Sequence, residues 1–188
     1  MKSFALLVAL LTAAGKTLAA EPTKTAETNL VFCSFELPDQ FGVAQRMMFP
    51  RTNVLVITVA DHKGSEQVAD WVRPLKTRFP EHLPIEGVAD VSSVPALLRP
   101  LVRREFKKRF TRPVMLDWSG NVVKPLNCLP QVANVFVVAT NGNVLLKLDG
   151  TVSEPALTQL FRILDPLIPT NGRTNEISKA SAAIPAGR

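Results

Sequence analysis

The segment that most constrains this fold is residues 54–60, an apolar run that passes directly into a polar loop at residues 61–67. A strand that is apolar throughout belongs in the middle of a sheet, because both of its faces must be covered. In open α/β sheets, the loop that leads from such a strand into a helix is where functional groups gather. The sequence therefore predicts an α/β domain whose functional site starts at Asp61.

Signals for strands and helices alternate around this segment. Val68, Trp71, Leu75 and Phe79 have the spacing of an amphipathic helix, which Ser65 would cap. The other expected elements are strands at residues 30–37, 43–49, 84–90, 113–117, 135–139 and 143–148, a helix at 95–110 bent at Pro100, and a closing helix at 155–164. This order predicts a three-layer α/β domain with a mixed central sheet.

Three motifs, taken with their order and spacing, resemble one superfamily. They are Phe-Glu-Leu-Pro-Asp-Gln-Phe-Gly at 35–42, Pro-Val-Met-Leu-Asp-Trp-Ser-Gly at 113–120, and Phe-Val-Val leading to Asn-Gly at 136–142. They resemble the thioredoxin-like superfamily, especially its redoxin and peroxiredoxin-like branch, and are most similar to the YtfJ-type periplasmic family. The resemblance covers residues 30–167 and implies a three-layer α/β/α sandwich with a mixed central sheet and an N-terminal β-hairpin.

The resemblance also implies where a redox site would lie. The superfamily's Cys-x-x-Cys pair would fall near Lys63 and Glu66, and its cis-proline would fall at Ala133. The loop there consists of Asp61, His62, Lys63, Gly64, Ser65 and Glu66, none of which is cysteine. Thiol exchange needs a thiolate and a resolving partner, so we expect a degenerate redox-site loop without dithiol catalysis.

The residues of this loop allow three interpretations. The start of the following helix, together with Lys63, offers donors to a small anion. Alternatively, Asp61 orients His62 as an acid/base pair. The third interpretation is a polar turn with a solvated Lys63.

The two cysteines of the chain, Cys33 and Cys128, are the remaining redox candidates. They form a structural disulfide, or they are two inert thiols, or Cys128 is a reactive thiol with Cys33 as its resolving partner. Sequence cannot place two sulfurs within bonding distance, so the three alternatives stay open. The two histidines, His62 and His82, have no ligand spacing with either cysteine, and we expect no metal and no cofactor.

A run from Arg99 to Arg112 combines basic and apolar residues at helical spacing. It is either a solvated face over a core stripe or a peripheral contact with an anionic surface. The formal net charge of +6 does not require a nucleic-acid partner, and we expect none. The expected partner is an unknown envelope protein or a small anionic ligand.

The two ends of the chain differ from the domain between them. Residues 1–20 have the pattern of a cleavable signal peptide, 21–28 of a polar spacer, 29–168 of a thioredoxin-like domain, and 169–188 of a disordered tail. Export to the periplasm or the extracellular space is expected. The sequence thus predicts an exported, non-catalytic binding or accessory module of the bacterial envelope. The alternative is a thiol-disulfide oxidoreductase or peroxiredoxin-like enzyme that uses Cys128 with Cys33.

Overall fold

The computed structural model describes residues 30–168. Its elements are β1 (Phe35–Pro38), β2 (Ala44–Met47), β3 (Leu55–Ala60), α1 (Ser65–Arg78), β4 (Ile85–Asp90), η1 (Ala96–Leu98), α2 (Arg99–Arg109), β5 (Met115–Asp117), η2 (Lys124–Leu126), β6 (Asn134–Val138), β7 (Val144–Asp149) and α3 (Glu154–Leu164). None of the helices in this described part is long and apolar enough to cross a membrane. The expected signal peptide, spacer and tail lie outside the described residues.

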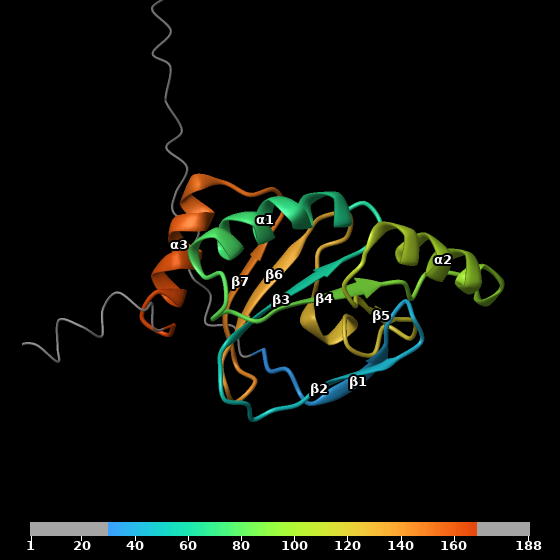
Figure 1. Cartoon of the computed structure of the whole chain (residues 1–188), viewed down its shortest axis with the longest axis horizontal. Coiled ribbons are helices and arrows are strands. Elements are labelled where there is room, and N and C mark those ends of the chain that lie inside the picture. The colour runs from blue at the N-terminus through green and yellow to red at the C-terminus, as the bar shows by residue number, and fades with distance from the viewer. Residues whose placement is uncertain (1–29, 169–188) are drawn as a thin grey trace, which may run out of the picture.

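A mixed sheet of five strands, in the order β5-β4-β3-β6-β7, forms the centre of the domain (Figure 1). β3 runs parallel to β4, and β4 parallel to β5. β6 runs antiparallel to both β3 and β7. All six residues of β3 are buried, as the unbroken apolar run predicts for a central strand.

The three α-helices pack on one face of this sheet. α1 and α3 cover β3, β6 and β7 through Trp71, Leu75 and Leu160, which are fully buried. α2 packs beside them over β4 and β5, where Val102 and Phe106 contact the cluster around Leu116. Figure 1 shows α1 and α3 together above the sheet and α2 displaced toward its β5 edge.

The β1–β2 hairpin and the connection containing η2 cover the opposite face (Figure 1). Leu37 and Met47 of the hairpin join Leu126 of η2 in one core cluster with Ile57 and Phe136 of the sheet. This outer layer therefore consists of a hairpin and a single 3-10 turn. The predicted α/β class, mixed sheet and N-terminal hairpin are confirmed.

Buried polar side chains attach the hairpin to the sheet. Gln40, which is fully buried, donates to the carbonyls of Phe110 and Arg112 at 3.2 and 2.8 Å. Its side-chain oxygen accepts the N–H of Val114 at 2.8 Å. Both ends of one amide thus fix the hairpin turn to the segment that enters β5.

Two local predictions are wrong. The helix expected at 95–110 is divided into η1 and α2, and Pro100 lies in the first turn of α2. A proline is tolerated there because the first N–H groups of a helix have no intrahelical acceptor, so Pro100 removes no helical hydrogen bond. The strand expected at 30–37 is only an isolated bridge from Val31 to Asn143, followed by β1.

Candidate functional site

The degenerate redox-site loop lies where β3 ends and α1 begins. Because β6 is antiparallel to β3, the start of β6 reaches the same edge, and Val59 pairs with Asn134. The segment 129–133, which precedes β6, therefore lies beside the loop. We call the set of interactions between residues 61–67 and residues 129–133 the loop contact.

Asp61 is at the centre of the loop contact. Its Oδ1 accepts the N–H of Gly64 at 2.8 Å, and its Oδ2 accepts the N–H of Gln131 at 2.7 Å. Lys63 Nζ adds a hydrogen bond to Gln131 Oε1 at 3.3 Å. One carboxylate therefore shapes its own turn and also binds the neighbouring segment.

Two further residues complete the loop contact. Gly64 is packed so closely that a Cβ atom there would lie 2.3 Å from the carbonyl oxygen of Val132. The N–H of Ala133, a fully buried residue, donates to Gln67 Oε1 at 3.1 Å. Ala133 is the residue at the expected cis-proline position. The cis peptide bond of the described chain is elsewhere, between Phe49 and Pro50.

Asn134 holds the shape of segment 129–133. Its amide nitrogen donates to the carbonyls of Leu129 and Val132 at 2.9 and 3.1 Å, and its side-chain oxygen accepts the N–H of Leu129 at 2.8 Å. Asn134 itself is buried. The segment that faces the degenerate loop is thus fixed from the β6 side.

The loop residues have the geometry of a polar turn. The predicted cap at Ser65 is wrong, because Gly64 already has helical dihedral angles and stands at the N-cap position without a side-chain bond. Ser65 Oγ instead donates to the carbonyl of His62 at 2.7 Å. Both carboxylate oxygens of Asp61 bind backbone N–H groups, and no hydrogen bond joins Asp61 to His62 within residues 30–168.

The start of α1 does not offer free donors to an anion. The N–H groups of Ser65, Glu66 and Gln67 donate to the carbonyls of Asp61, Lys63 and Gly64, at 3.0, 3.2 and 3.0 Å. Lys63 interacts with Gln131, as described above. The structure therefore favours the polar turn over the other two interpretations of this loop.

The two cysteines are free thiols and lie toward opposite ends of β6. Beside Cys33, the N–H of Phe32 donates to the carbonyl of Gly142, beyond the last residue of β6. Beside Cys128, Leu129 binds the side chain of Asn134, the first residue of β6. The four steps of that strand span about 13 Å. Cys33 and Cys128 therefore follow or precede contacts at opposite ends of β6, which opposes a disulfide between them.

The environment of Cys128 opposes nucleophilic chemistry. Its side chain packs against the core cluster beneath the hairpin. Burial raises the pKa of the Cys128 thiol to about 11, with a smaller lowering from Lys147 and a further increase from Asp90. A thiol with this pKa is protonated at neutral pH, whereas exchange requires the thiolate.

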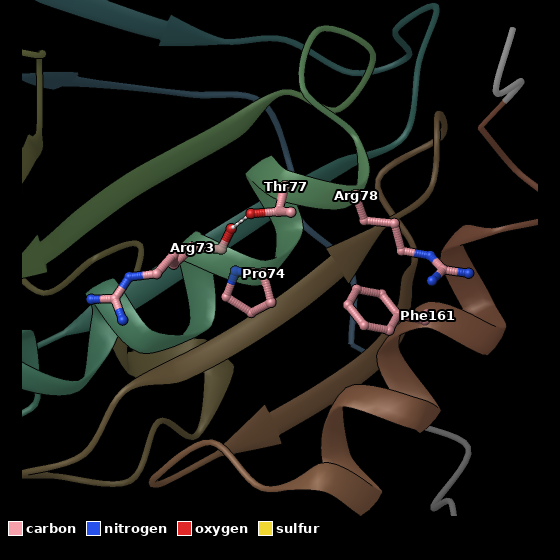
Figure 2. Close-up of a pocket in the computed structure, with 5 residues that line it drawn as sticks. All are labelled: Arg73, Pro74, Thr77, Arg78 and Phe161. Atoms are coloured by element: carbon pink, nitrogen blue, oxygen red, sulfur yellow. Dashed lines mark hydrogen bonds between the residues drawn. The ribbon is translucent and has the colours of Figure 1, made fainter.

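An open hollow between α1 and α3 lies on the helical face, away from the loop contact (Figure 2). Arg78 lines this hollow, and its guanidinium lies 4.7 Å from the centre of the Phe161 ring. The same guanidinium donates to both carboxylate oxygens of Asp165 at 2.8 and 2.7 Å. Thr77 Oγ1 donates to the carbonyl of Arg73 in its own helix. The polar groups of this hollow are thus engaged within the fold.

Residues 30–168 contain no group of three or more His, Cys, Asp or Glu side chains arranged to hold a metal. The basic run from Arg99 to Arg112 contains α2, which η1 precedes. Val102 and Phe106 pack inward, but Leu97, Leu98 and Leu101 are 89%, 46% and 52% exposed. The core stripe of this segment is therefore narrower than its sequence suggests.

Solved structures resemble this domain closely in fold. A candidate thiol:disulfide interchange protein DsbE from Chlorobium tepidum aligns with a TM-score of 0.54 and 17% identity, over 71% of this chain and 93% of that one. The pneumococcal exposed lipoprotein thioredoxin Etrx1 from Streptococcus pneumoniae aligns with a TM-score of 0.55 and 13% identity, over 69% of this chain and 98% of that one. The thioredoxin domain of a thiol-disulfide oxidoreductase from Bacteroides vulgatus aligns with a TM-score of 0.51 and 10% identity, over 72% of this chain and 96% of that one. The domain has the thioredoxin-like fold.

This result confirms the predicted fold class. At these sequence identities the similarity establishes the fold and does not establish the activity. No family model and no curated protein matches the chain.

Sequence reasoning missed three amide side chains of this site, which are Gln67 at the start of α1 and Gln131 and Asn134 on the β6 side. Glutamine and asparagine at these positions have no motif of their own. Their partners come from segments more than 60 residues away for Gln67 and Gln131. The available signal was the resemblance, which implies that residue 133 and the loop after β3 belong to one site. The pairing of β3 with β6 brings them together.

Proposed function

We propose that this chain is an exported thioredoxin-like domain protein that lacks dithiol redox catalysis and serves as a binding or accessory module in the bacterial envelope. The observation that carries this proposal is the loop contact. The loop has no thiol, Asp61 and Gln67 accept the N–H groups of Gln131 and Ala133, and Gly64 packs closely against the carbonyl of Val132. The loop thus lacks a thiol nucleophile, and the backbone N–H groups of Gln131 and Ala133 opposite it are already bound.

An insulin-reduction assay tests the absence of catalysis. We expect the purified protein to accelerate insulin precipitation by dithiothreitol no more than a Cys33→Ser/Cys128→Ser variant does. The variant is the matched control, because it has the same fold and no sulfhydryl group. A rate comparable to that of thioredoxin, lost in the variant, would refute the proposal.

The alternative function is an oxidoreductase that uses Cys128 with Cys33. The separation of the two cysteines and the raised pKa of Cys128 oppose it. Equilibration in glutathione buffers, followed by alkylation and intact mass measurement, separates the two hypotheses. We expect the thiols to remain uncoupled. Joint conversion to a disulfide at about −120 to −270 mV, the range of exchange proteins, would support the enzyme.

Export is part of the proposal. The signal-like pattern of residues 1–20 supports it, and one of the similar solved structures is that of an exposed lipoprotein. Fractionation of a bacterial culture that expresses the chain, with N-terminal sequencing of the product, tests this point. We expect a product that begins near Glu21. A full-length cytoplasmic product would contradict export.

The partner of this module is proposed to be an envelope protein or a small anionic ligand. The exposed leucines of η1 and α2 support it, because they lie among arginines on a helix without a fully buried residue. Such a surface is typical of peripheral contact with an anionic surface.

A further inference from the structure

The inner side of α2 brings two arginines to one tryptophan. Arg99 and Arg103 are one helical turn apart, and Trp118 directly follows β5. The guanidinium carbons lie 5.2 Å and 5.8 Å from the centre of the Trp118 ring. These distances are within the range of cation–π interaction. We call these three residues the Arg-Trp cluster.

The Arg-Trp cluster contains N–H donors without acceptors. Nε of Arg99, Nε of Arg103 and Nε1 of Trp118 are buried and have no hydrogen-bond partner in residues 30–168. No other buried side-chain nitrogen or oxygen in this part of the chain lacks a partner. Buried polar groups are nearly always paired, so an exception confined to one cluster calls for an explanation.

No carboxylate of the described chain serves the Arg-Trp cluster. On α2, Glu105 pairs with Arg104 and Lys108. Asp117, next to Trp118, is fully buried, and its oxygens accept N–H groups of the following turn, including those of Gly120 and Val123. Two cations therefore lie close together without an anion between them.

The position of the Arg-Trp cluster in the sheet is one at which ligands bind. Trp118 lies at the carboxyl end of β5, which runs parallel to β4. In α/β sheets, ligands bind outside the carboxyl ends of parallel strands. The cluster is built by α2 and β5, whereas the loop contact is built by the ends of β3 and β6. No residue is shared between the two.

We propose that Arg99, Arg103 and Trp118 bind a phosphate group. A phosphate monoester carries a charge of about −1.5 to −2 at pH 7, which matches two guanidinium groups without a carboxylate partner, and it has three acceptor oxygens for N–H donors. Guanidinium groups also fit phosphate oxygens in a bidentate manner. A single carboxylate supplies half the charge and fewer acceptors. The inference names a ligand chemistry for the binding module proposed above, but it does not depend on the absence of redox catalysis.

Two sources supply this chemistry, a soluble phosphate monoester and a lipid with a phosphate monoester headgroup, such as phosphatidic acid. Leu97, Leu98 and Leu101 are exposed beside Arg99. Exposed apolar side chains next to Arg99 in the chain are compatible with a lipid source. The experiment therefore has one arm for each source.

The first arm measures thermal stabilisation by inorganic phosphate at constant ionic strength, with chloride as the replaced anion. We expect the melting temperature to rise with phosphate. Arg99→Gln and Arg103→Gln should each weaken the apparent affinity about tenfold, because each removes a charged hydrogen-bond donor. Trp118→Phe keeps the ring and removes only Nε1–H, so we expect a smaller loss.

The control for this arm is Arg104→Gln, which removes an equal charge from the exposed side of the same helix. Its affinity for phosphate should match that of the unmodified protein. Circular dichroism without phosphate shows whether each variant is folded. Equal weakening in Arg104→Gln and Arg103→Gln would overturn the proposal, because it would indicate a diffuse basic surface.

The second arm measures co-sedimentation with phosphatidylcholine vesicles that contain phosphatidic acid and with pure phosphatidylcholine vesicles. If the source is a lipid, the anionic vesicles bind the protein, and Arg99→Gln and Arg103→Gln reduce that binding while Arg104→Gln does not. If the source is soluble, only the first arm is positive. Absence of binding in both arms would refute the site. The site would also be refuted if phosphate left the melting temperature unchanged and the Arg99→Gln and Arg103→Gln variants bound vesicles as well as the unmodified protein. The insulin assay is independent of either result.

Discussion

At the scale of single residues, Gly64 shows how tightly the loop contact is packed. Its φ of −60° suits any L-amino acid, so its backbone conformation does not require glycine. The lack of space at this position requires glycine, because an added Cβ would lie 2.3 Å from the Val132 carbonyl oxygen. A methyl group at this position must therefore displace segment 129–133.

We predict that Gly64→Ala lowers the free energy of unfolding by about 1–3 kcal/mol, the usual cost of overpacking. Chemical denaturation measures it. The matched control is Gly87→Ala in β4, where an added Cβ meets its nearest atoms at ordinary distances of 3.7 and 3.8 Å. If both variants are equally stable, segments 61–64 and 129–133 are not packed as described.

Cys128 gives a prediction that depends on pH. Its pKa of about 11 compares with an ordinary value of 9.0, so its thiolate fraction at pH 7–8 is about 100-fold lower than that of an ordinary thiol. Alkylation of Cys128 by iodoacetamide should be slow at pH 8 and should accelerate until about pH 11. Peptide mass mapping measures it. The Cys33→Ser variant isolates the signal of Cys128, and a rate that levels off below pH 9 would contradict the burial argument.

At the scale of elements, the hairpin depends on Gln40 more than on its own pairing. An isolated two-stranded hairpin is marginally stable in water. Here the Gln40 amide binds three backbone groups between Phe110 and Val114. The hairpin is therefore an integral layer of the domain, because its turn is held by the segment between α2 and β5.

We predict that Gln40→Ala destabilises the protein by at least about 2 kcal/mol, because it leaves buried backbone groups unpaired. Gln45→Ala is the control. It removes one side-chain bond, to Asp39, in a half-buried position and should cost about 1 kcal/mol or less. Hydrogen exchange should report faster exchange in β1 and β2 for Gln40→Ala. Equal effects of the two substitutions would show that Gln40 is not the main attachment.

At the scale of the whole molecule, most elements and their order were predictable from the sequence. The loop contact and the Arg-Trp cluster were not. Periodicity and turn residues locate β3, α1, β6 and α3, because burial of apolar side chains acts locally along each element. The loop contact depends on Asp61 meeting Gln131, 70 positions later in the chain. The Arg-Trp cluster depends on α2 passing over β5. Neither juxtaposition leaves a periodic signal in the sequence, since each arises only when the sheet is assembled.

A thioredoxin-like fold does not by itself confer redox activity, and this chain allows the two requirements to be separated. A Lys63→Cys/Glu66→Cys variant restores a Cys-x-x-Cys pair at the start of α1. We predict that it still reduces insulin far more slowly than thioredoxin does, because Asp61 and Gln67 keep the backbone of segment 129–133 engaged. Adding Asp61→Ala, which releases the N–H of Gln131, should raise the rate above that of the two-cysteine variant. If the two-cysteine variant is already as fast as thioredoxin, the loop contact does not close the site, and loss of the cysteines alone explains the absence of catalysis.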